Sequence, residues 1–279
     1  MEVKFIKASP TENMTLLIET PVAREKQLAV AERLIAYGSV YAEQAGYIEE
    51  AENPAAEKRL QMMAGEFCGN ASLSLAAWLA QKKNLPIGEK TEITLEVSGA
   101  EALVRCEMKR EAEHRFLGRV AMPLPQTIIS FPFPIEKRAF TLDGERIELT
   151  AVVFAGITHI LVPASLWGEN AAKKAEHAAR VWAKELPPVF GLLLFDEKEK
   201  SLKPLVAVGD VSLIWERGCG SGTSAVGAYL AAREKKDVTV SLKQPGGVMH
   251  ATVSYQNGAV TKIEITGSVA IVAEGTAYL

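Results

Sequence analysis

Alternating and β-branched runs dominate the hydrophobic pattern of the chain, and a few stretches with helical periodicity interrupt them. Residues 24–36 predict an amphipathic helix, because Leu28, Ala31 and Leu34 recur on one face. Residues 171–186 predict a second amphipathic helix that ends before two prolines. The strand-like segments are residues 3–8, 13–19, 91–97, 102–108, 146–155, 159–163, 189–195, 211–215 and 238–242.

Turn residues divide the pattern further. Near the C-terminus, tight turns are predicted at Pro245-Gly246-Gly247, Asn257-Gly258 and Thr266-Gly267. Residues 122–135 contain prolines at positions 123, 125, 132 and 134, each of which removes a donor from a strand ladder. We therefore interpret this stretch as an interdomain connector or a sheet edge.

The two halves of the chain repeat one order of elements, β-β-α-β-β-Cys-helix-β. The first half passes through NMTLLIE, the helix at 24–36, QAGYIEEAE and LQMMAGEFCGN. The second passes through ITHILVPA, the helix at 171–186, VFGLLLFDEKE and LVAVGDVSLIWERGCGSG. After each Cys-Gly pair a short helix is predicted, over 71–80 and 222–232, with Ser72 and Thr223 at the same offset. Five matching segments in succession indicate a duplication.

The two helices after the cysteines have apolar or small side chains on every face, and Ser and Thr are their only polar residues. A helix of this kind has to be buried. The sequence therefore predicts an α/β (α+β) protein with two pseudo-symmetric domains, each a curved mixed sheet wrapped around a central helix. We expect the domains to span residues 1–126 and 127–279, with the last strand, about 268–279, packing back on the N-terminal domain.

Composition narrows the class of protein. Among 279 residues, 48% are hydrophobic and 23% charged, which excludes intrinsic disorder. The formal net charge of -3 argues against a nucleic-acid partner. No apolar run reaches the length of a membrane span, and the first residues lack a signal-peptide core. Three cysteines, an odd number, do not make a disulfide framework. We expect a cytoplasmic protein without a nucleic-acid or membrane partner.

Cys68 and Cys219 are the candidate chemical groups, because each stands where a strand ends and a buried helix begins. The first N–H groups of a helix have no internal acceptor and lie at its positive end. Two such ends in one cleft could hold a carboxylate and lower the pKa of a nearby thiol. One thiolate would then remove the proton from a bound Cα while the opposite thiol delivers a proton to the other face.

Other interpretations of the cysteines are less favoured. The cysteine of a lone Cys-Gly pair is most often a small hydrophobic residue in the core. The repetition of the pair at equivalent places favours a catalytic role instead. A structural disulfide between Cys68 and Cys219 conflicts with a cytoplasmic location. The sequence has no Cys-x-x-Cys or Cys/His spacing typical of zinc ligands. Glycines 218, 220 and 222 do not match the dinucleotide-binding motif, whose third glycine stands at a different offset. We assign no metal and no cofactor.

The remaining cysteine and the histidines carry no predicted role in chemistry. Cys106 lies in the middle of a predicted strand with no glycine after it, which favours core packing. The histidines His114, His159, His177 and His250 are scattered along the chain, and such residues are more often surface or packing residues than catalysts. We assign them nothing.

The segments EFCGNAS and ERGCGSGTSA, in duplicated halves, resemble the diaminopimelate epimerase and proline racemase superfamily. The segments SPTENMTLLI, EQAGYIE, KQPGGVM and ITGSVAIVAEGTAYL are similar to one branch of it, the histidine racemases of staphylopine-type metallophore biosynthesis. The resemblance implies two α/β domains with a cleft between them. It also implies cofactor-independent racemisation of a small-molecule amino acid, with histidine as the expected substrate. Dimers are common in the superfamily, so a homodimer is an option, although no residue pattern demands one.

The resemblance also implies roles for particular positions. Cys68 and Cys219 would be the catalytic thiols. Backbone donors around the α-carboxylate would come from Gly69, Asn70, Gly220 and Ser221. Asn13 and Gln44 would line the substrate pocket, and the carboxylate of Glu43 would face the substrate side chain.

The chain departs from the superfamily at several positions. Glu216-Arg217-Gly218 directly precedes the second cysteine, whereas diaminopimelate epimerases carry this element further upstream. Asn70 stands where proline racemases have histidine, and Arg217-Gly218 where the histidine racemase branch has asparagine and serine. The alternatives are therefore another isomerase of the superfamily (a diaminopimelate or hydroxyproline epimerase, or an unsaturated-acid isomerase), a catalytically silent amino-acid-binding protein, or a thiol redox switch.

Overall fold

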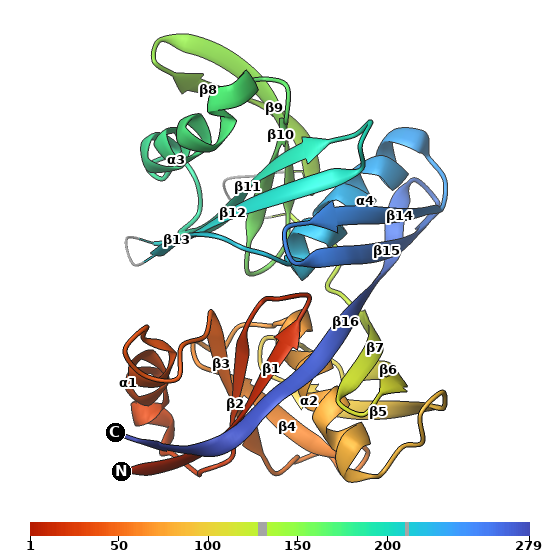
Figure 1. Ribbon diagram of the computed structural model, residues 1–279. Helices are drawn as coiled ribbons and strands as arrows, with labels where there is room; N and C mark the ends of the chain where they lie inside the picture. Colours follow the sequence, from red (N-terminus) through yellow and green to blue (C-terminus); the bar gives the residue numbers. More distant parts are fainter. Residues whose placement is uncertain (128–132, 210–211) are drawn as a thin grey trace. The chain divides into compact units, whose positions relative to one another are not determined.

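The structure, a computed structural model, describes residues 1–127, 133–209 and 212–279 (Figure 1). The chain divides into unit 1, Met1–Ala121 with Thr266–Leu279, and unit 2, Met122–Ile265. The domain limits derived from the sequence stay a prediction. Of the predicted connector, residues 122–127 have no regular structure and 128–132 lie outside the described residues. Within the described ranges, the helices are too short or too polar to cross a membrane.

Unit 1 is a mixed sheet whose strand order returns to its start. The strands follow one another as β1-β2-β3-β4-β5-β6-β7-β16, and β1 pairs with β16 as well as with β2. The elements are β1 (Glu2–Pro10), β2 (Thr15–Ile18), α1 (Arg24–Ile35), β3 (Gln44–Glu49), β4 (Lys58–Met62), α2 (Gly69–Lys82), β5 (Lys90–Val97), β6 (Val104–Ala112), β7 (Arg115–Ala121) and the second part of β16 (Ala259–Tyr278).

Helix α2 is the central helix of unit 1. It packs against β1, β2, β5, β6 and β7 (Figure 1). Every residue from Gly69 to Ala80 is buried. Two serine hydroxyls inside this apolar environment donate to backbone oxygens one turn earlier, Ser72 to Cys68 (2.8 Å) and Ser74 to Asn70 (2.8 Å). These bonds satisfy the hydroxyls without solvent, so the helix can be buried on all sides.

Helix α1 covers a separate part of unit 1. Its buried Ala31 and Leu34 pack with Leu16, Ile18 and Tyr47 of the adjacent strands in a second apolar cluster. The predicted amphipathic helix at 24–36 is confirmed to within one residue at its end.

The strands of unit 2 are also mixed and pair in the order β8-β9-β10-β11-β12-β14-β15-β16, with the short β13 paired to β12. Its elements are β8 (Ile135–Leu142), β9 (Glu145–Val153), β10 (Thr158–Pro163), a 3-10 turn (Gly168–Asn170), α3 (Ala171–Trp182), β11 (Val189–Asp196), β12 (Ser201–Val208), β13 (Ser212–Trp215), α4 (Gly220–Glu234), β14 (Val238–Gln244), β15 (Gly247–Gln256) and the first part of β16.

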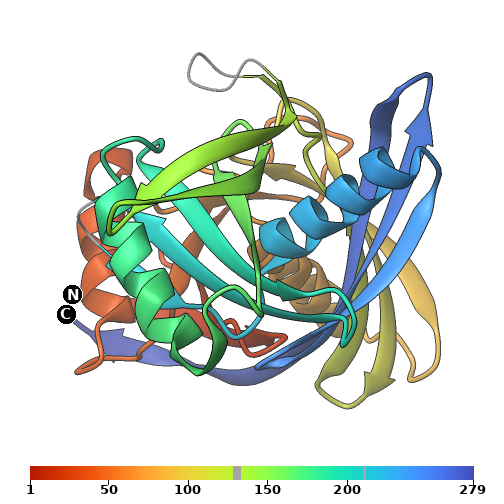
Figure 2. The same ribbon diagram turned by 90° about the horizontal axis from the view of Figure 1, so that it is seen from above.

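Two helices cover opposite faces of the unit 2 sheet (Figure 2). Alternate residues of β11 face them: Leu192 and Leu194 pack with α3, whereas Leu193 and Phe195 pack with α4. A strand buried on both faces needs apolar residues at every position, which explains the continuous apolar run of this segment.

The two units share one pattern of strand pairing. From β1 to β6 the pairings are antiparallel, parallel, antiparallel, parallel and antiparallel, and the same series runs from β9 through β10, β11, β12 and β14 to β15. In each unit the last parallel pair flanks the helix that follows the cysteine. The predicted fold class, a curved mixed sheet around a central helix in each half, is confirmed.

Some local predictions were wrong. Thr266-Gly267 is no turn but lies inside the long strand β16, where the chain passes from one unit to the other. The turn at Asn257-Gly258 is confirmed, with both residues at positive φ between β15 and β16. The second amphipathic helix ends at Trp182 rather than at residue 186. Of the predicted strand at 211–215, the first residue lies outside the described residues and the rest form β13.

Candidate active site

Cys68 is the N-cap residue of α2, so the helix begins two residues earlier than the sequence predicted. Its sulfur accepts a hydrogen bond from the backbone N–H of Ala71 (3.4 Å). Its carbonyl accepts from both the N–H (3.0 Å) and the hydroxyl (2.8 Å) of Ser72. The half-buried thiol therefore lies at the positive end of a buried helix.

Gln44 joins Cys68 to a polar group at the start of β3. The Cys68 thiol donates to Oε1 of Gln44 (3.0 Å), while Nε2 of Gln44 donates to Oδ1 of Asn13 (2.8 Å) and to Oγ1 of Thr15 (2.9 Å). The hydroxyl of Thr15 donates to the backbone oxygen of Asn13 (3.1 Å), so its oxygen accepts from Gln44. This fixes the amide with its carbonyl toward the sulfur.

The structure thus brings the predicted residues Asn13, Gln44 and Cys68 into one hydrogen-bonded group in unit 1. Gly69 and Asn70 form the buried first turn of α2, and Glu43 is half-buried next to Gln44. Contact of these residues with a substrate stays a prediction.

Cys219 occupies the same place in unit 2, as the N-cap residue of α4. Its sulfur accepts from the backbone N–H of Gly222 (3.2 Å) and lies 3.5 Å from the hydroxyl oxygen of Ser221. The hydroxyl of Thr223 donates to its carbonyl (2.6 Å), as Ser72 does to Cys68 in unit 1. Of the residues predicted in this half, the structure brings Cys219, Gly220 and Ser221 together in one turn. Their contact with substrate also stays a prediction.

Burial raises the pKa of the Cys219 thiol well above its usual range, and the charge of Glu216 and its hydrogen bond raise it further. The Ser221 hydroxyl and the Gly222 N–H oppose this by stabilising the thiolate, but they do not outweigh burial. The sequence predicted a lowered thiol pKa from the helix end alone. For Cys219 this was wrong, because the residue is only 2% exposed and burial raises its pKa.

His159 is a polar neighbour of this thiol that the sequence interpretation missed. Its Nε2 lies 2.9 Å from the hydroxyl oxygen of Ser221, which in turn contacts Cys219. The ring is fully buried on β10, and burial lowers its pKa to about 3, so it is neutral. Gly191 allows this position, because a Cβ there would lie 2.4 Å from Nδ1 of His159. The one sequence signal is a histidine directly before the apolar residues 160–162 of β10.

Cys106 lies fully buried on β6, and burial raises its pKa. The predicted core role is confirmed for this cysteine. Over the part of the chain that the structure describes, no three His, Cys, Asp or Glu side chains gather in a way that could hold a metal ion.

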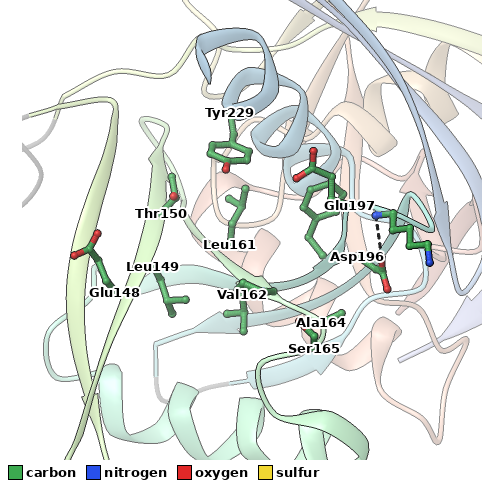
Figure 3. A pocket seen from close by; sticks show the side chains of 13 residues that line it. Glu148, Leu149, Thr150, Leu161, Val162, Ala164, Ser165, Asp196, Glu197 and Tyr229 are labelled. Atoms are coloured by element: carbon green, nitrogen blue, oxygen red, sulfur yellow. Dashed lines mark hydrogen bonds between the residues drawn. The ribbon is translucent and has the colours of Figure 1, made fainter. Parts of the chain in front are cut away.

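A cavity of about 460 Å³ opens elsewhere in unit 2 (Figure 3). Its lining includes Glu148, Asp196, Glu197 and Tyr229, and none of the predicted site residues. Glu197 pairs with Arg233 (2.6 Å). Tyr229 lies ten residues along α4 from Cys219, a distance of about 15 Å along the helix axis. This cavity is therefore separate from the thiol.

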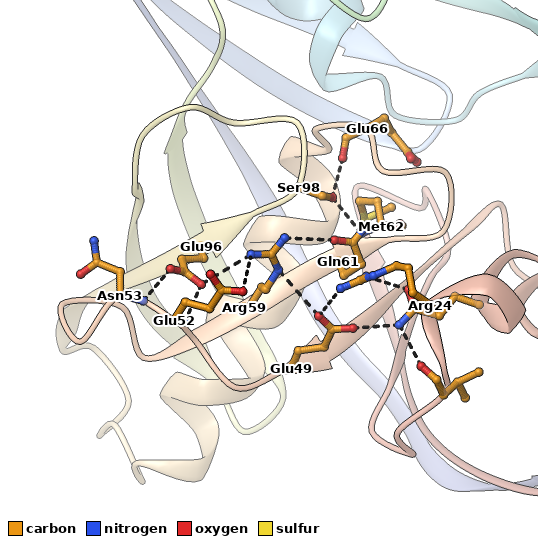
Figure 4. A network of polar contacts seen from close by, with 12 residues as sticks. Arg24, Glu49, Glu52, Asn53, Arg59, Gln61, Met62, Glu66, Glu96 and Ser98 are labelled. Atoms are coloured by element: carbon orange, nitrogen blue, oxygen red, sulfur yellow. Dashed lines mark hydrogen bonds and ion pairs between the residues drawn. The ribbon is translucent and has the colours of Figure 1, made fainter.

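The loop before Cys68 is held by the residues that follow β5 (Figure 4). The hydroxyl of Ser98 accepts from the N–H of Met62 (2.9 Å) and donates to the carbonyl of Glu66 (2.9 Å). Gly99, at φ +70, packs so closely that a Cβ would lie 2.4 Å from the nitrogen of Phe67.

An ion-pair network lies on the same part of unit 1 (Figure 4). Arg59 of β4 approaches Glu49 of β3 (3.7 Å), Glu96 of β5 (3.9 Å) and Glu52 (3.9 Å). These contacts tie three neighbouring strands together, although pairs at such distances add little stability individually.

A family model described as the histidine racemase CntK N-terminal domain matches residues 2–278. The chain belongs to the histidine racemase family. Within this family, a histidine racemase of Fusobacterium nucleatum is 32% identical over 282 residues, covering 99% of this chain and 97% of the relative. A histidine racemase of Staphylococcus aureus is 27% identical, covering 99% of this chain and 98% of the relative.

Solved structures with the same fold include a hydroxyproline epimerase from Agrobacterium vitis with bound trans-4-hydroxy-L-proline. The TM-score is 0.70 at 14% identity, over 100% of this chain and 93% of that one. At this identity the likeness shows the fold alone. Together with the family match, it confirms the resemblance to the superfamily and to its histidine racemase branch that the sequence motifs indicated.

Replacing Gly99 with alanine should destabilise unit 1 through the loop before Cys68. Gly88 is a matched control, because it also has positive φ but no described atom outside its chain neighbours would lie within 4 Å of an added Cβ. We expect G88A to cost about 1–2 kcal/mol from backbone conformation alone. We expect G99A to cost about 1–3 kcal/mol more, because the new methyl overlaps backbone atoms. Urea unfolding measures both, and equal losses would contradict the close packing of Gly99.

Buried neutral His159 should make stability depend on pH. Its folded pKa, about 3, lies below the unfolded value of about 6.5, so below pH 6.5 the unfolded chain binds a proton that the folded chain does not. The free energy of unfolding should therefore fall by about 2 kcal/mol between pH 7 and pH 5 through this group. H159Q lacks the titration and should lose correspondingly less over the same interval. Equal losses in urea unfolding of the two proteins would show that His159 is not buried in its neutral form.

Proposed function

We propose that this protein is a histidine racemase that works without a cofactor and uses Cys68 and Cys219 as its two acid–base groups. The family match over nearly the whole chain and the named relatives support the activity. The observation that carries the mechanism is that each cysteine is the N-cap of a largely buried helix, at equivalent places in a duplicated fold. Serine, threonine, aspartate or asparagine would cap these helices better than cysteine, so a thiol at both places favours a role in chemistry.

In the proposed complex, the first N–H groups of α2 and α4 bind the α-carboxylate of the amino acid. Gly69, Asn70, Gly220 and Ser221 contribute these groups, and the positive helix ends favour an anion there. The two sulfurs then lie on opposite faces of Cα. This arrangement requires both units to contribute to one substrate site.

The reaction consists of two proton transfers. One thiolate takes the α-proton and becomes a thiol, and the electron pair of the broken C–H bond passes into the carboxylate. The opposite thiol gives its proton to Cα from the other face and becomes the thiolate. The fixed N–H groups stabilise the negative charge on the carboxylate in the transition state. Charge and proton number are unchanged, so neither oxidant nor cofactor is needed.

The surroundings of the two thiols differ. The Cys68 sulfur donates to the Gln44 carbonyl oxygen (3.0 Å) and accepts from the N–H of Ala71 (3.4 Å). At Cys219, part of the raised pKa comes from the charge of Glu216. A cationic group of the substrate beside this carboxylate offsets that charge and makes the Cys219 thiolate more accessible when substrate is bound.

The proposal is tested by incubating purified protein with L-histidine in D2O without added cofactor. We expect D-histidine to form, with deuterium at Cα. C68A and C219A should each lower racemisation by about 100-fold or more, because each removes an acid–base group. C106A is the matched control and should keep near-normal activity, because Cys106 is buried in the core on β6.

Chiral chromatography measures the enantiomers, and mass spectrometry measures the deuterium. The panel includes proline, hydroxyproline and diaminopimelate, so that another isomerase activity would be detected. Absence of exchange across the panel, or full activity in either C68A or C219A, would refute the proposed mechanism.

A further inference from the structure

The turn between β14 and β15 is hydrogen-bonded to the segment that ends in Cys219. The N–H of Gly246 donates to the carbonyl of Arg217 (2.7 Å), and the guanidinium of Arg217 donates to the carbonyl of Pro245 (3.2 Å). The side chain of Gln244, the last residue of β14, completes the contact: its Oε1 accepts from the N–H of Cys219 (2.8 Å). Three hydrogen bonds thus join residues 244–246 to 217–219.

Gln244 also reaches the other side of the Cys219 backbone. Its Nε2 donates to the hydroxyl oxygen of Thr223 (2.7 Å), and that hydroxyl donates to the carbonyl of Cys219 (2.6 Å). One glutamine therefore fixes the N–H of Cys219 directly and its C=O through Thr223. The orientation of the amide follows from the chemistry, because the Cys219 N–H requires an acceptor.

The corresponding strand in unit 1 supports its cysteine differently. Ser98, just after β5, bonds to Met62 and to Glu66, and so holds the loop two residues before Cys68 rather than Cys68 itself. Direct support of the cysteine backbone by a side chain from the neighbouring strand is thus found at Cys219 in unit 2. Cys219 is also almost fully buried, at 2% exposed.

We propose that Gln244 is a positioning residue for the Cys219 thiol, fixing the Cys219 backbone so that Sγ stays over the first turn of α4. The catalytic consequence rests on the proposed racemase function. Rotation of the Cys219 backbone would move Sγ away from the N–H of Gly222 and the hydroxyl of Ser221. A displacement of about 1 Å at a reacting group is enough to slow catalysis by about 100-fold.

Holding the Cys219 N–H has a second effect. Because Gln244 occupies this donor, the Cys219 N–H does not compete for an anion. The donors that follow it, on Gly220 and Ser221, are those that the proposed function assigns to the carboxylate. Gln244 thereby helps to determine where the substrate lies relative to Sγ.

The test compares Q244M with Q61M. Gln244 and Gln61 are equally buried, each 8% exposed, and methionine keeps their approximate volume without a hydrogen-bonding amide. The Gln61 amide donates to the backbone oxygen of Met62 and accepts from the guanidinium of Arg59, so its contacts lie on β4. Protein labelled with 15N-cysteine gives three amide signals, which the variants C68A, C106A and C219A assign.

We expect the Cys219 amide of Q244M to exchange with solvent about tenfold faster or more, because it has lost its acceptor. The signals of Cys68 and Cys106 should be unchanged, and Q61M should change none of the three. Q244E keeps an oxygen acceptor for this N–H and should restore its protection. In activity, kcat of Q244M should fall about 10- to 100-fold, with KM within about twofold of the wild-type value.

Unchanged exchange at Cys219 in Q244M would overturn the proposal. So would faster exchange with a kcat no lower than that of Q61M, because Gln244 would then only cap the backbone. If the wild-type protein does not racemise any amino acid, the proposed function fails. The amide exchange of Cys219 then still decides whether Gln244 positions this residue.

Discussion

The hydrogen bond from a helix N–H to a cysteine sulfur is the interaction on which the candidate site depends. The first turns of α2 and α4 are largely buried, so water has little access to the donors there. An N-cap side chain has to satisfy them, and serine, threonine, aspartate or asparagine would do it better than cysteine. Both units nevertheless have cysteine there. The choice of a weaker cap at both places is best explained by the chemistry of a thiol.

The residues that surround the cysteine sulfur differ between the two units. In unit 1 the sulfur of Cys68 faces the amide carbonyl of Gln44, held in orientation by Asn13 and Thr15. In unit 2 the sulfur of Cys219 faces Ser221, which is held by neutral His159. A two-base racemase starts each turnover with one thiol and one thiolate, so unequal surroundings are compatible with its cycle. What has to be equal is the access of the two sulfurs to one carbon atom.

The repeated pattern of the sequence predicted the fold class, both cysteines and the helices that follow them. It did so because each half contains the same order of elements within one continuous stretch of chain, so the two halves support one interpretation. His159 and Gln244 were not predicted, because their partners lie 62 and 25 residues away in sequence and no local pattern marks such contacts. Thr266-Gly267 has the composition of a turn, but pairing along β16 overrides that local preference. The raised pKa of Cys219 was missed because it depends on burial, which the residues around a cysteine do not reveal.

The central claim is that Cys68 and Cys219 act on the two faces of one Cα. A crystal structure of the wild-type protein with bound L-histidine tests it most directly. We expect both Sγ atoms on opposite sides of Cα, each at about 3.5 Å, with the carboxylate on the N–H groups of α2 and α4. Both sulfurs on one side of Cα, or one of them beyond reach of it, would contradict this claim.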